Sequence, residues 1–225
     1  MRKQMVSGVL LGMSALGVSG LAQAELTANL GVTSNYVFRG ETQTDDGPAI
    51  QGGVDFTHES GLYAGIWASN VEDSFVHDKG YEYDLYAGYN FKVNDKVGFD
   101  IGYIAYRYTG TDTFVDTDEI FGGVNFYGFS AIYYDGNPDL GPDYSYIDLK
   151  YTLALPQEFN VHLHYGNKDS DNSSLDAEDA SIGVSKEVAG LDLSLTWTTI
   201  DYDNSALSDE DELFVTVTKS FDLMK

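Results

Sequence analysis

Two histidines, His162 and His164, are the residues of this sequence best spaced to bind a ligand together. They stand two positions apart in an alternating segment, so both side chains point to the same side of a strand. Such a pair binds a metal when a third ligand completes the site. The chain has no cysteine, and two histidines alone are more typical of solvated polar side chains. We therefore expect no metal and no cofactor.

Nucleophilic catalysis would require a nucleophile and a base within hydrogen-bond reach, with a third group that orients the base. The sequence contains no Gly-x-Ser-x-Gly element, and no His-x-Ser pair falls on one strand face. His58 lies in a predicted short turn and is expected to be structural. We therefore expect that the protein is not an enzyme.

Two acidic segments, 169–176 and 201–205, have the composition of calcium-binding loops. Both lack the glycine that an EF-hand loop carries at its sixth position. Divalent cations between such loops would relieve the repulsion of like charges and could bridge lipid phosphates. The segments do not indicate a dedicated calcium site.

Several segments of the sequence alternate between apolar and polar residues, and a set of charged residues falls on the polar positions. This set is the best candidate for a functional site. A charge on a lipid-facing position costs about 2–4 kcal/mol for Lys or Arg at the membrane midplane, so these side chains are expected to face inward. They either line a pore and set its ion preference or only keep the interior wet by pairing locally. The set comprises Asp55, Glu82, Asp84, Asp100, Glu119, Asp148 and Asp192, with Arg39 and Lys150 as the main cations.

Strands must position these residues, because hydrophobic residues recur at every second position along the whole chain after residue 25. In 81–91, for example, Tyr81, Tyr83 and Leu85 alternate with Glu82 and Asp84. Helical spacing is absent from this part of the sequence. The alternating segments, twelve in number, lie near 26–37, 50–56, 62–69, 81–91, 97–105, 119–126, 129–134, 146–153, 160–166, 180–186, 191–198 and 212–221.

The connections between these segments distinguish a membrane barrel from a soluble sandwich. Long acidic connections near 39–48, 70–80, 109–118, 135–143, 167–179 and 201–211 alternate with short ones near 58–61, 92–96, 127–128, 155–158 and 187–190. Outer-membrane barrels have short periplasmic turns and longer external loops. We therefore predict an all-β, antiparallel, up-and-down transmembrane barrel of about 12 strands, closed by pairing of 26–37 with 212–221.

Aromatic residues are expected to form two girdles at the membrane interfaces. One girdle lies near the long loops and the other near the short turns. The first comprises Tyr36, Phe38, Tyr81, Tyr165 and Trp197, and the second Phe56, Phe91, Phe126 and Phe159. Trp67 is left unassigned, because either of the two alternating rows of residues around it could face lipid.

The N-terminus has the features of a secretory signal. Arg2 and Lys3 precede an apolar run, and Ala22-Gln23-Ala24 supplies a small-x-small cleavage pattern. We predict a signal peptide over 1–24 and a barrel over 25–225, with the mature protein in the cell outer membrane. Beyond Glu25 no apolar run is long enough for a transmembrane helix.

The net charge of the chain argues against nucleic acid as a partner. The chain has 12 Lys and Arg against 36 Asp and Glu, a formal net charge of −24. Nucleic-acid binding requires cations that neutralise phosphates, so no nucleic acid is expected. The expected partners are outer-membrane lipid, including lipopolysaccharide, and small solutes or ions.

The stretch 36–70 resembles the TorF-type porins, a proteobacterial family of conserved hypothetical outer-membrane barrels. The likeness is dense over the first third of the chain, and Thr42 departs from it where Ser is expected. It implies an outer-membrane barrel with a pore and supplies no substrate. The matching residues are Tyr36, Phe38, Arg39, Gly40, Gln43, Pro48, Ala49, Gln51, Gly52, Gly53, Asp55, His58, Gly61, Tyr63, Gly65, Trp67, Ser69 and Asn70, followed by Glu82, Asp84, Tyr86 and Gly88.

The sequence thus predicts passive diffusion of small solutes across the outer membrane, with cations or neutral molecules favoured over anions. Glu82, Asp84 and Asp100 are expected to contribute most of the wall potential. The alternative is a non-conducting structural or adhesin-like barrel with a filled lumen. In that case inward aromatic residues would plug it: Tyr86, Tyr106, Phe121 and Phe214.

Overall fold

The structure is a computed structural model that describes residues 24–72, 79–111 and 114–224. The first barrel strand begins at Glu25. The predicted signal peptide, apart from Ala24, lies outside the described residues. No helix within the described part of the chain is long and apolar enough to cross a membrane.

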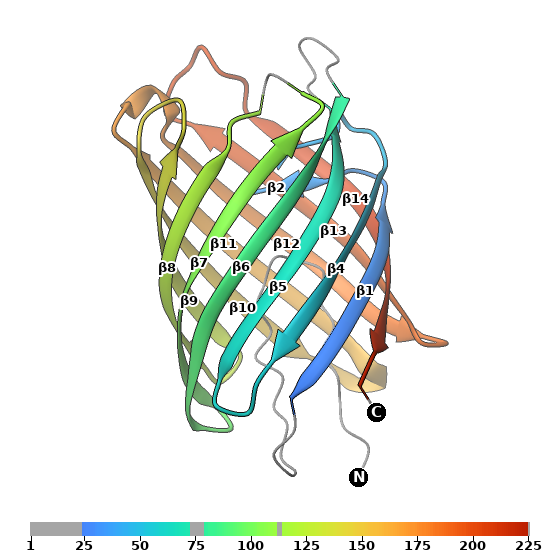
Figure 1. The fold of residues 1–225 in the computed structure, drawn as a ribbon. Coiled ribbons are helices and arrows are strands. Elements are labelled where there is room, and N and C mark those ends of the chain that lie inside the picture. Colours follow the sequence, from blue (N-terminus) through green and yellow to red (C-terminus); the bar gives the residue numbers. More distant parts are fainter. Residues whose placement is uncertain (1–23, 73–78, 112–113, 225) are drawn as a thin grey trace.

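Twelve antiparallel strands form a closed barrel, as predicted, in which each strand pairs with its neighbours in the chain (Figure 1). The barrel is sealed where β1 pairs with both β4 and β14. Closure leaves no open edge, so the backbone groups of the wall are paired without water. The barrel strands are β1 (Glu25–Thr33), β4 (Ala49–Thr57), β5 (Leu62–Glu72), β6 (Lys79–Asn94), β7 (Val97–Thr109), β8 (Thr117–Phe126), β9 (Phe129–Pro138), β10 (Tyr144–Ala154), β11 (Phe159–Ser170), β12 (Ala177–Val188), β13 (Leu191–Tyr202) and β14 (Glu210–Asp222).

The closing seam is the predicted one with a shorter first strand. Pairing runs from Thr27 opposite Asp222 to Thr33 opposite Thr216. The expectation that 26–37 pairs throughout is wrong for 34–37, because the chain leaves the wall after Thr33.

The segment 34–48 folds into the barrel, and it contains a small hairpin of β2 (Val37–Phe38) and β3 (Glu41–Thr42). The turn of this hairpin is Arg39 and Gly40, both with positive φ (49° and 84°). Glycine adopts this conformation without a steric penalty. The sequence predicted a strand followed by an exposed loop here, so the inward hairpin is a correction.

The remaining connections alternate in position as predicted, but the strands continue further into the acidic segments. For example, β11 extends to Ser170 and β12 begins at Ala177, which leaves 171–176 instead of the predicted 167–179. Polar residues alternate as regularly as apolar ones there, so the ladder persists beyond the apolar band. Short 3-10 helices occupy two connections, η1 (Pro156–Glu158) and η2 (Ser173–Leu175).

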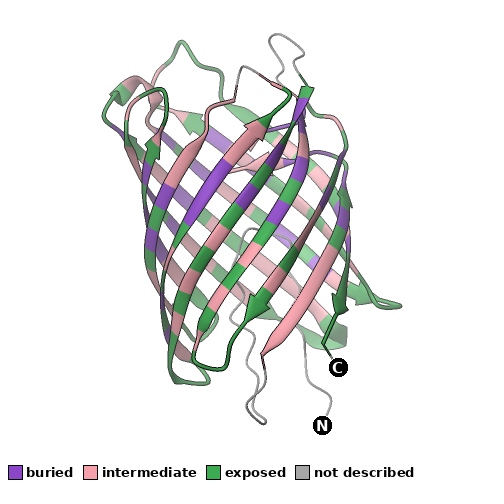
Figure 2. Cartoon of the chain, in the orientation of Figure 1, coloured by how far each residue is buried: buried purple, intermediate pink, exposed green. Residues whose placement is uncertain are grey.

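The outward face of the barrel is apolar in a band between two charged rims. Ile50, Ile101 and Leu213 are each 65% exposed, and exposed and buried positions alternate along the strands (Figure 2). Among the described residues, charges on the outward rows lie near strand ends, such as Asp118 and Glu178 towards the loops. This surface matches a bilayer, which solvates apolar side chains and penalises charge at its midplane.

The aromatic girdles are present in part. Tyr81, Trp197 and Phe91 are exposed on the outside, as are Tyr165, Phe56 and Phe126, while Phe159 packs under the Lys186 ammonium. Tyr36 and Phe38 are not girdle residues, because the 34–48 segment carries them into the lumen. Trp67, which the sequence left unassigned, is buried and packs edge-to-face against Tyr36 with ring centroids 5.4 Å apart.

Candidate functional site

The charged residues singled out in the sequence all lie inside the barrel. Asp100, Glu119 and Lys150, for example, occupy the inward rows of β7, β8 and β10. Arg39 differs from the others because it comes from the β2–β3 turn and not from the wall. The wall residues are Asp55, Glu82, Asp84, Asp100, Glu119, Asp148, Lys150 and Asp192.

Arg39 forms the central ion pair of the lumen. Its Nη1 and Nη2 atoms donate to the two carboxylate oxygens of Glu119 at 2.6 and 3.1 Å. The Tyr106 and Tyr144 hydroxyls donate to the same carboxylate at 3.0 and 2.7 Å. Glu119 is fully buried, so each of its oxygens is held by two donors. Bidentate geometry makes this the strongest type of side-chain ion pair.

Aromatic rings surround the Arg39 guanidinium. Its central carbon lies 4.0 Å from the Tyr146 ring centroid, 4.8 Å from Phe38 and 4.9 Å from Tyr134. Cation–π contacts strengthen when desolvated, and arginine stacks on aromatic faces better than lysine does. The hairpin tip is therefore fixed by an ion pair and by packing.

The hairpin reaches across the lumen to the opposite wall. A Cβ atom at Gly40 would approach Ile200 of β13 and Asp179 of β12. Tyr202, at the end of β13, donates its hydroxyl to Glu41 at 2.7 Å. The hairpin thus contacts β8 and β10 on one side and β12 and β13 on the other, and it narrows the lumen at this level.

The base of the hairpin is anchored to β5 and β14 at the end of the barrel that carries the long connections. The backbone amide of Glu72 donates to the carbonyl of Gln43 at 2.9 Å, and Thr44 forms a β-bridge with Glu72. Asn35 donates to Glu212 of β14 at 3.0 Å. These contacts make the 34–48 segment part of the wall as well as of the lumen.

Four inward tyrosines lie over inward glycines and reach a carboxylate one strand further on. Tyr63 of β5 covers Gly88 of β6 and donates to Asp100 of β7 at 2.8 Å. Tyr86 of β6 covers Gly65 of β5 and donates to Asp55 of β4. In each case a side chain at the glycine would overlap the tyrosine ring, so the glycine provides the space for it.

The same arrangement occurs twice around β10. Tyr144 covers Gly136 of β9 and donates to Glu119 of β8. Tyr146 covers Gly166 of β11 and donates to Asp179 of β12 at 2.8 Å. Several inward carboxylates are thus fixed hydrogen-bond acceptors of the wall, each partly screened by a phenol.

A charged network lies below the hairpin on β10, β11 and β12. Lys150 Nζ and Asp148 Oδ2 are 2.5 Å apart. His164 lies between two carboxylates, with Nδ1 3.2 Å from Asp148 and Nε2 2.6 Å from Asp179. Asp179 was not predicted from the sequence, because the strand was expected at 180–186 and begins at Ala177. Asp179 falls on the same alternating row as Ser181 and Ser185, and this alternation could have placed it inside the barrel.

His162 points inward like His164, but it binds different partners. Its Nε2 is 2.8 Å from the Ser185 hydroxyl and its Nδ1 is 3.2 Å from the Thr152 hydroxyl. The orienting group is thus a hydroxyl where a catalytic triad uses a carboxylate. In the described part of the chain, no three or more His, Cys, Asp or Glu side chains are grouped to hold a metal.

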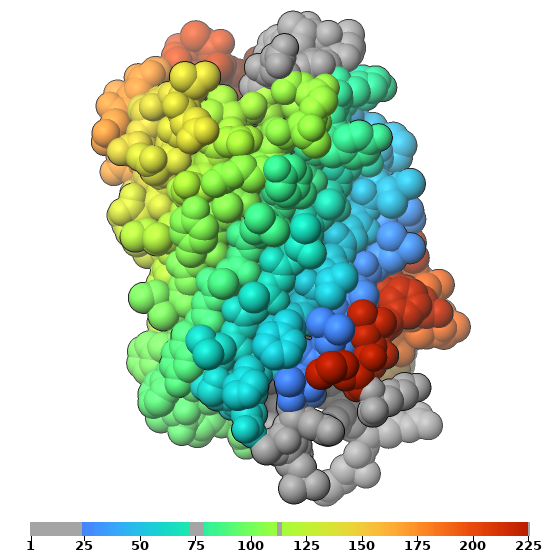
Figure 3. Space-filling model, in the orientation of Figure 1, coloured from blue at the N-terminus to red at the C-terminus, as the bar shows by residue number. Residues whose placement is uncertain are grey.

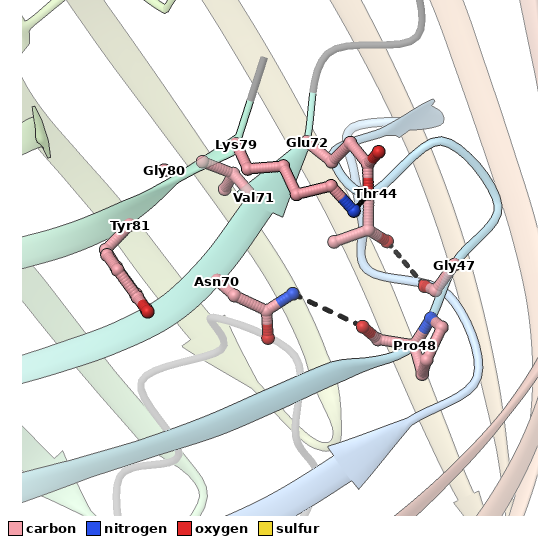
Figure 4. A pocket seen from close by; sticks show the side chains of 9 residues that line it. All are labelled: Thr44, Gly47, Pro48, Asn70, Val71, Glu72, Lys79, Gly80 and Tyr81. Atoms are coloured by element: carbon pink, nitrogen blue, oxygen red, sulfur yellow. Dashed lines mark hydrogen bonds and ion pairs between the residues drawn. The ribbon is translucent and has the colours of Figure 1, made fainter. Parts of the chain in front are cut away.

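A pocket of about 340 Å³ lies at the rim that carries the long connections, between the 44–48 turn and the adjoining ends of β5 and β6 (Figure 4). Asn70 donates to the Pro48 carbonyl at 3.2 Å, and Lys79 pairs with Glu72 at 2.8 Å. The first contact holds the turn against β5, and the second joins the ends of β5 and β6. Elsewhere on the face seen in Figure 3, side chains form a continuous outer wall.

The fold and the polar lumen together define a porin-like barrel. The chain belongs to a family described as "Bacterial protein of unknown function (Gcw_chp)", which matches residues 18–222. No curated protein matches it in sequence.

Similar solved structures are porins with very different sequences. "KdgM porin" is 10% identical with a TM-score of 0.59, and the match covers 87% of this chain and 99% of that chain. "NanC porin structure in rhombohedral crystal form" is 8% identical with a TM-score of 0.58, covering 88% and 100%. A further structure, "KdgM porin in complex with disordered oligogalacturonate", is 9% identical with a TM-score of 0.56, covering 88% and 99%. At these identities the likeness is one of fold.

Proposed function

We propose that the protein is an outer-membrane channel for passive diffusion of small solutes, exported by a signal peptide and embedded in lipid that includes lipopolysaccharide. The observation that supports this most directly is the closed barrel itself, apolar outside between charged rims and polar inside. The resemblance to TorF-type porins agrees with it. The proposal includes no catalysed reaction, no cofactor and no nucleic-acid partner.

We further propose that the channel favours cations or neutral solutes. Carboxylates outnumber cations on the inward rows, and Arg39 and Lys150 are each paired with one of them. Charges in a narrow passage are screened less than charges at an open surface, where the Debye length is about 8 Å at physiological salt. Oligogalacturonate, which one of the similar porins binds, is a polyanion and would be disfavoured here.

A specific observation favours the alternative, a structural barrel that does not conduct. The β2–β3 hairpin crosses the lumen, and Tyr106, Phe121, Tyr134 and Tyr146 form a buried aromatic cluster beside it. Inward placement of Tyr86, Tyr106, Phe121 and Phe214 agrees with the sequence prediction. The two functions differ in whether the hairpin leaves a passage for solute or closes the lumen.

Reversal potentials in a salt gradient test the proposal. Purified protein in a planar bilayer should show a potential whose sign indicates cation preference, and high salt should reduce it. With divalent cations removed by EDTA, neutralising Glu82, Asp84 and Asp100 together to Gln or Asn should weaken the preference while heat-modifiable barrel migration is kept. Equal passage of anions would contradict the selectivity, and absence of conductance in folded protein would favour the structural barrel.

A further inference from the structure

Two neighbouring inward carboxylates of β6 have no cationic partner among the described residues. Glu82 is 1% exposed and Asp84 is fully buried. Both Asp84 oxygens and Glu82 Oε2 lack a hydrogen-bond partner within the described chain. Glu82 Oε1 receives only a 3.3 Å hydrogen bond from the Tyr108 hydroxyl. This pair differs from Asp55, Asp100 and Glu119, each of which receives a tyrosine hydroxyl at 3.0 Å or less.

A second unpartnered group faces the same place. The Tyr36 hydroxyl is directed at Glu82 but makes no hydrogen bond of good geometry, although Tyr36 is 6% exposed. The nearby Arg39 is committed to Glu119 with both terminal nitrogens. Three oxygen-bearing side chains thus converge on one point from two elements, β6 and the segment that leads into the hairpin.

Two adjacent buried carboxylates need a positive charge at this point, which either a shared proton or a bound cation can supply. An ion withdrawn from water loses several kcal/mol of solvation free energy, which is recovered only by pairing and by additional hydrogen bonds. Two adjacent carboxylates repel each other as well, so each increases the demand for a counter-charge. The described side chains do not supply that charge.

We propose that Glu82 and Asp84 bind one divalent cation of the Ca²⁺ type. Its charge equals that of the two carboxylates, and hard cations take carboxylate and other oxygen ligands. Ca²⁺ accepts irregular coordination and several ligand numbers, whereas Mg²⁺ requires near-ideal octahedral geometry. The Tyr36 and Tyr108 hydroxyls, with water, complete the oxygen shell.

The location of the site couples the cation to the hairpin. Tyr36 immediately precedes β2 and packs on Trp67 of β5. A cation between Tyr36 and β6 therefore holds the base of the hairpin against the wall, while Arg39 holds its tip. Removal of the cation should loosen the base and leave the Arg39–Glu119 pair in place.

Calorimetric titration of detergent-folded mature protein with CaCl2, after EDTA treatment, tests the site. The wild type should show one saturable site that the double variant E82Q/D84N loses. Its affinity should fall by about 100-fold or more, since loss of outer-shell partners alone costs 10–100-fold in metal affinity. The matched control is D169N/D171N, which removes two exposed carboxylates with the same spacing, one at the end of β11 and one in the connection that follows it. It should retain the site.

Three results would overturn the proposal. They are an absence of saturable Ca²⁺ binding in the wild type, binding that E82Q/D84N retains, and binding that the control also loses. If the double variant does not fold, the single variants E82Q and D84N replace it, and each should weaken binding. The titration needs neither a bilayer nor transport, so its result is independent of whether the barrel conducts.

Discussion

The inward carboxylates fall into groups according to which side chain reaches them. Asp55 and Asp100 receive a tyrosine hydroxyl across a glycine, whereas Asp148 is paired with Lys150 and His164. Sequence parity placed these carboxylates inside the barrel. It did not show their partners, because each partner lies on another strand and depends on the pairing register.

A glycine under a tyrosine should be hard to replace. Gly65→Ala would place a methyl group in the Tyr86 ring and displace its hydrogen bond to Asp55. We expect it to lower the free energy of unfolding by about 1–3 kcal/mol, as other overpacking substitutions do. Urea unfolding in lipid vesicles measures this.

The control is Gly122→Ala, where the nearest atom to an added Cβ is the Asp100 carbonyl oxygen at 3.8 Å. That variant should unfold like the wild type. Equal loss of stability in both variants would show that the tyrosine has no special requirement for Gly65.

Among the elements, the β2–β3 hairpin is the one that the sequence hid most completely. Its strands are two residues long, too short for a periodic signal, and Tyr36 and Phe38 continue the alternation of β1. The resemblance over 36–70 did mark Phe38, Arg39 and Gly40 as a motif. The inward path itself depends on contacts with distant strands, above all Glu119 of β8 and Ile200 of β13.

Loss of the ion pair should release the hairpin tip. In Glu119→Gln the Arg39 guanidinium stays buried without its counter-charge, and breaking one side of such a pair costs about 3–5 kcal/mol. Trypsin should then cleave after Arg39, which should resist cleavage in the wild type because its side chain is only 14% exposed. Mass spectrometry of the fragments identifies the cut.

Asp118→Asn provides a matched control on the same strand, because Asp118 is on the outward row and pairs with Arg107 at 2.5 Å. Arg39 should remain protected in that variant. Rapid cleavage after Arg39 in the wild type would show that the hairpin is not held in the lumen.

At the scale of the whole molecule, the sequence predicted the barrel, its strand number and its closing seam. The alternation of residues and the connection lengths predict these features because every wall strand faces lipid on one side and the lumen on the other. Apolar side chains are favoured on the first side and polar ones on the second. The strand ends in the acidic segments were predicted less well. In these segments the outward residues are polar, so the alternation of apolar and polar residues does not show where strand pairing ends.

The alternation of long and short connections also predicts the orientation of the barrel in the membrane. An epitope inserted at 172, in the connection between β11 and β12, should be accessible to antibody on intact cells. One inserted at 94, the last residue of β6 before the turn to β7, should be accessible only after permeabilisation. The opposite labelling would mean that the acidic connections face the periplasm.

The central claim, a channel narrowed by an inward hairpin, is tested most directly by single-channel conductance in planar bilayers. The comparison is between the wild type and a variant in which residues 36–43 are replaced by a short Gly-Ser linker. We expect small openings in the wild type and a several-fold larger conductance in the variant, with heat-modifiable migration preserved in both. A folded variant that does not conduct, or that conducts no more than the wild type, would contradict the claim.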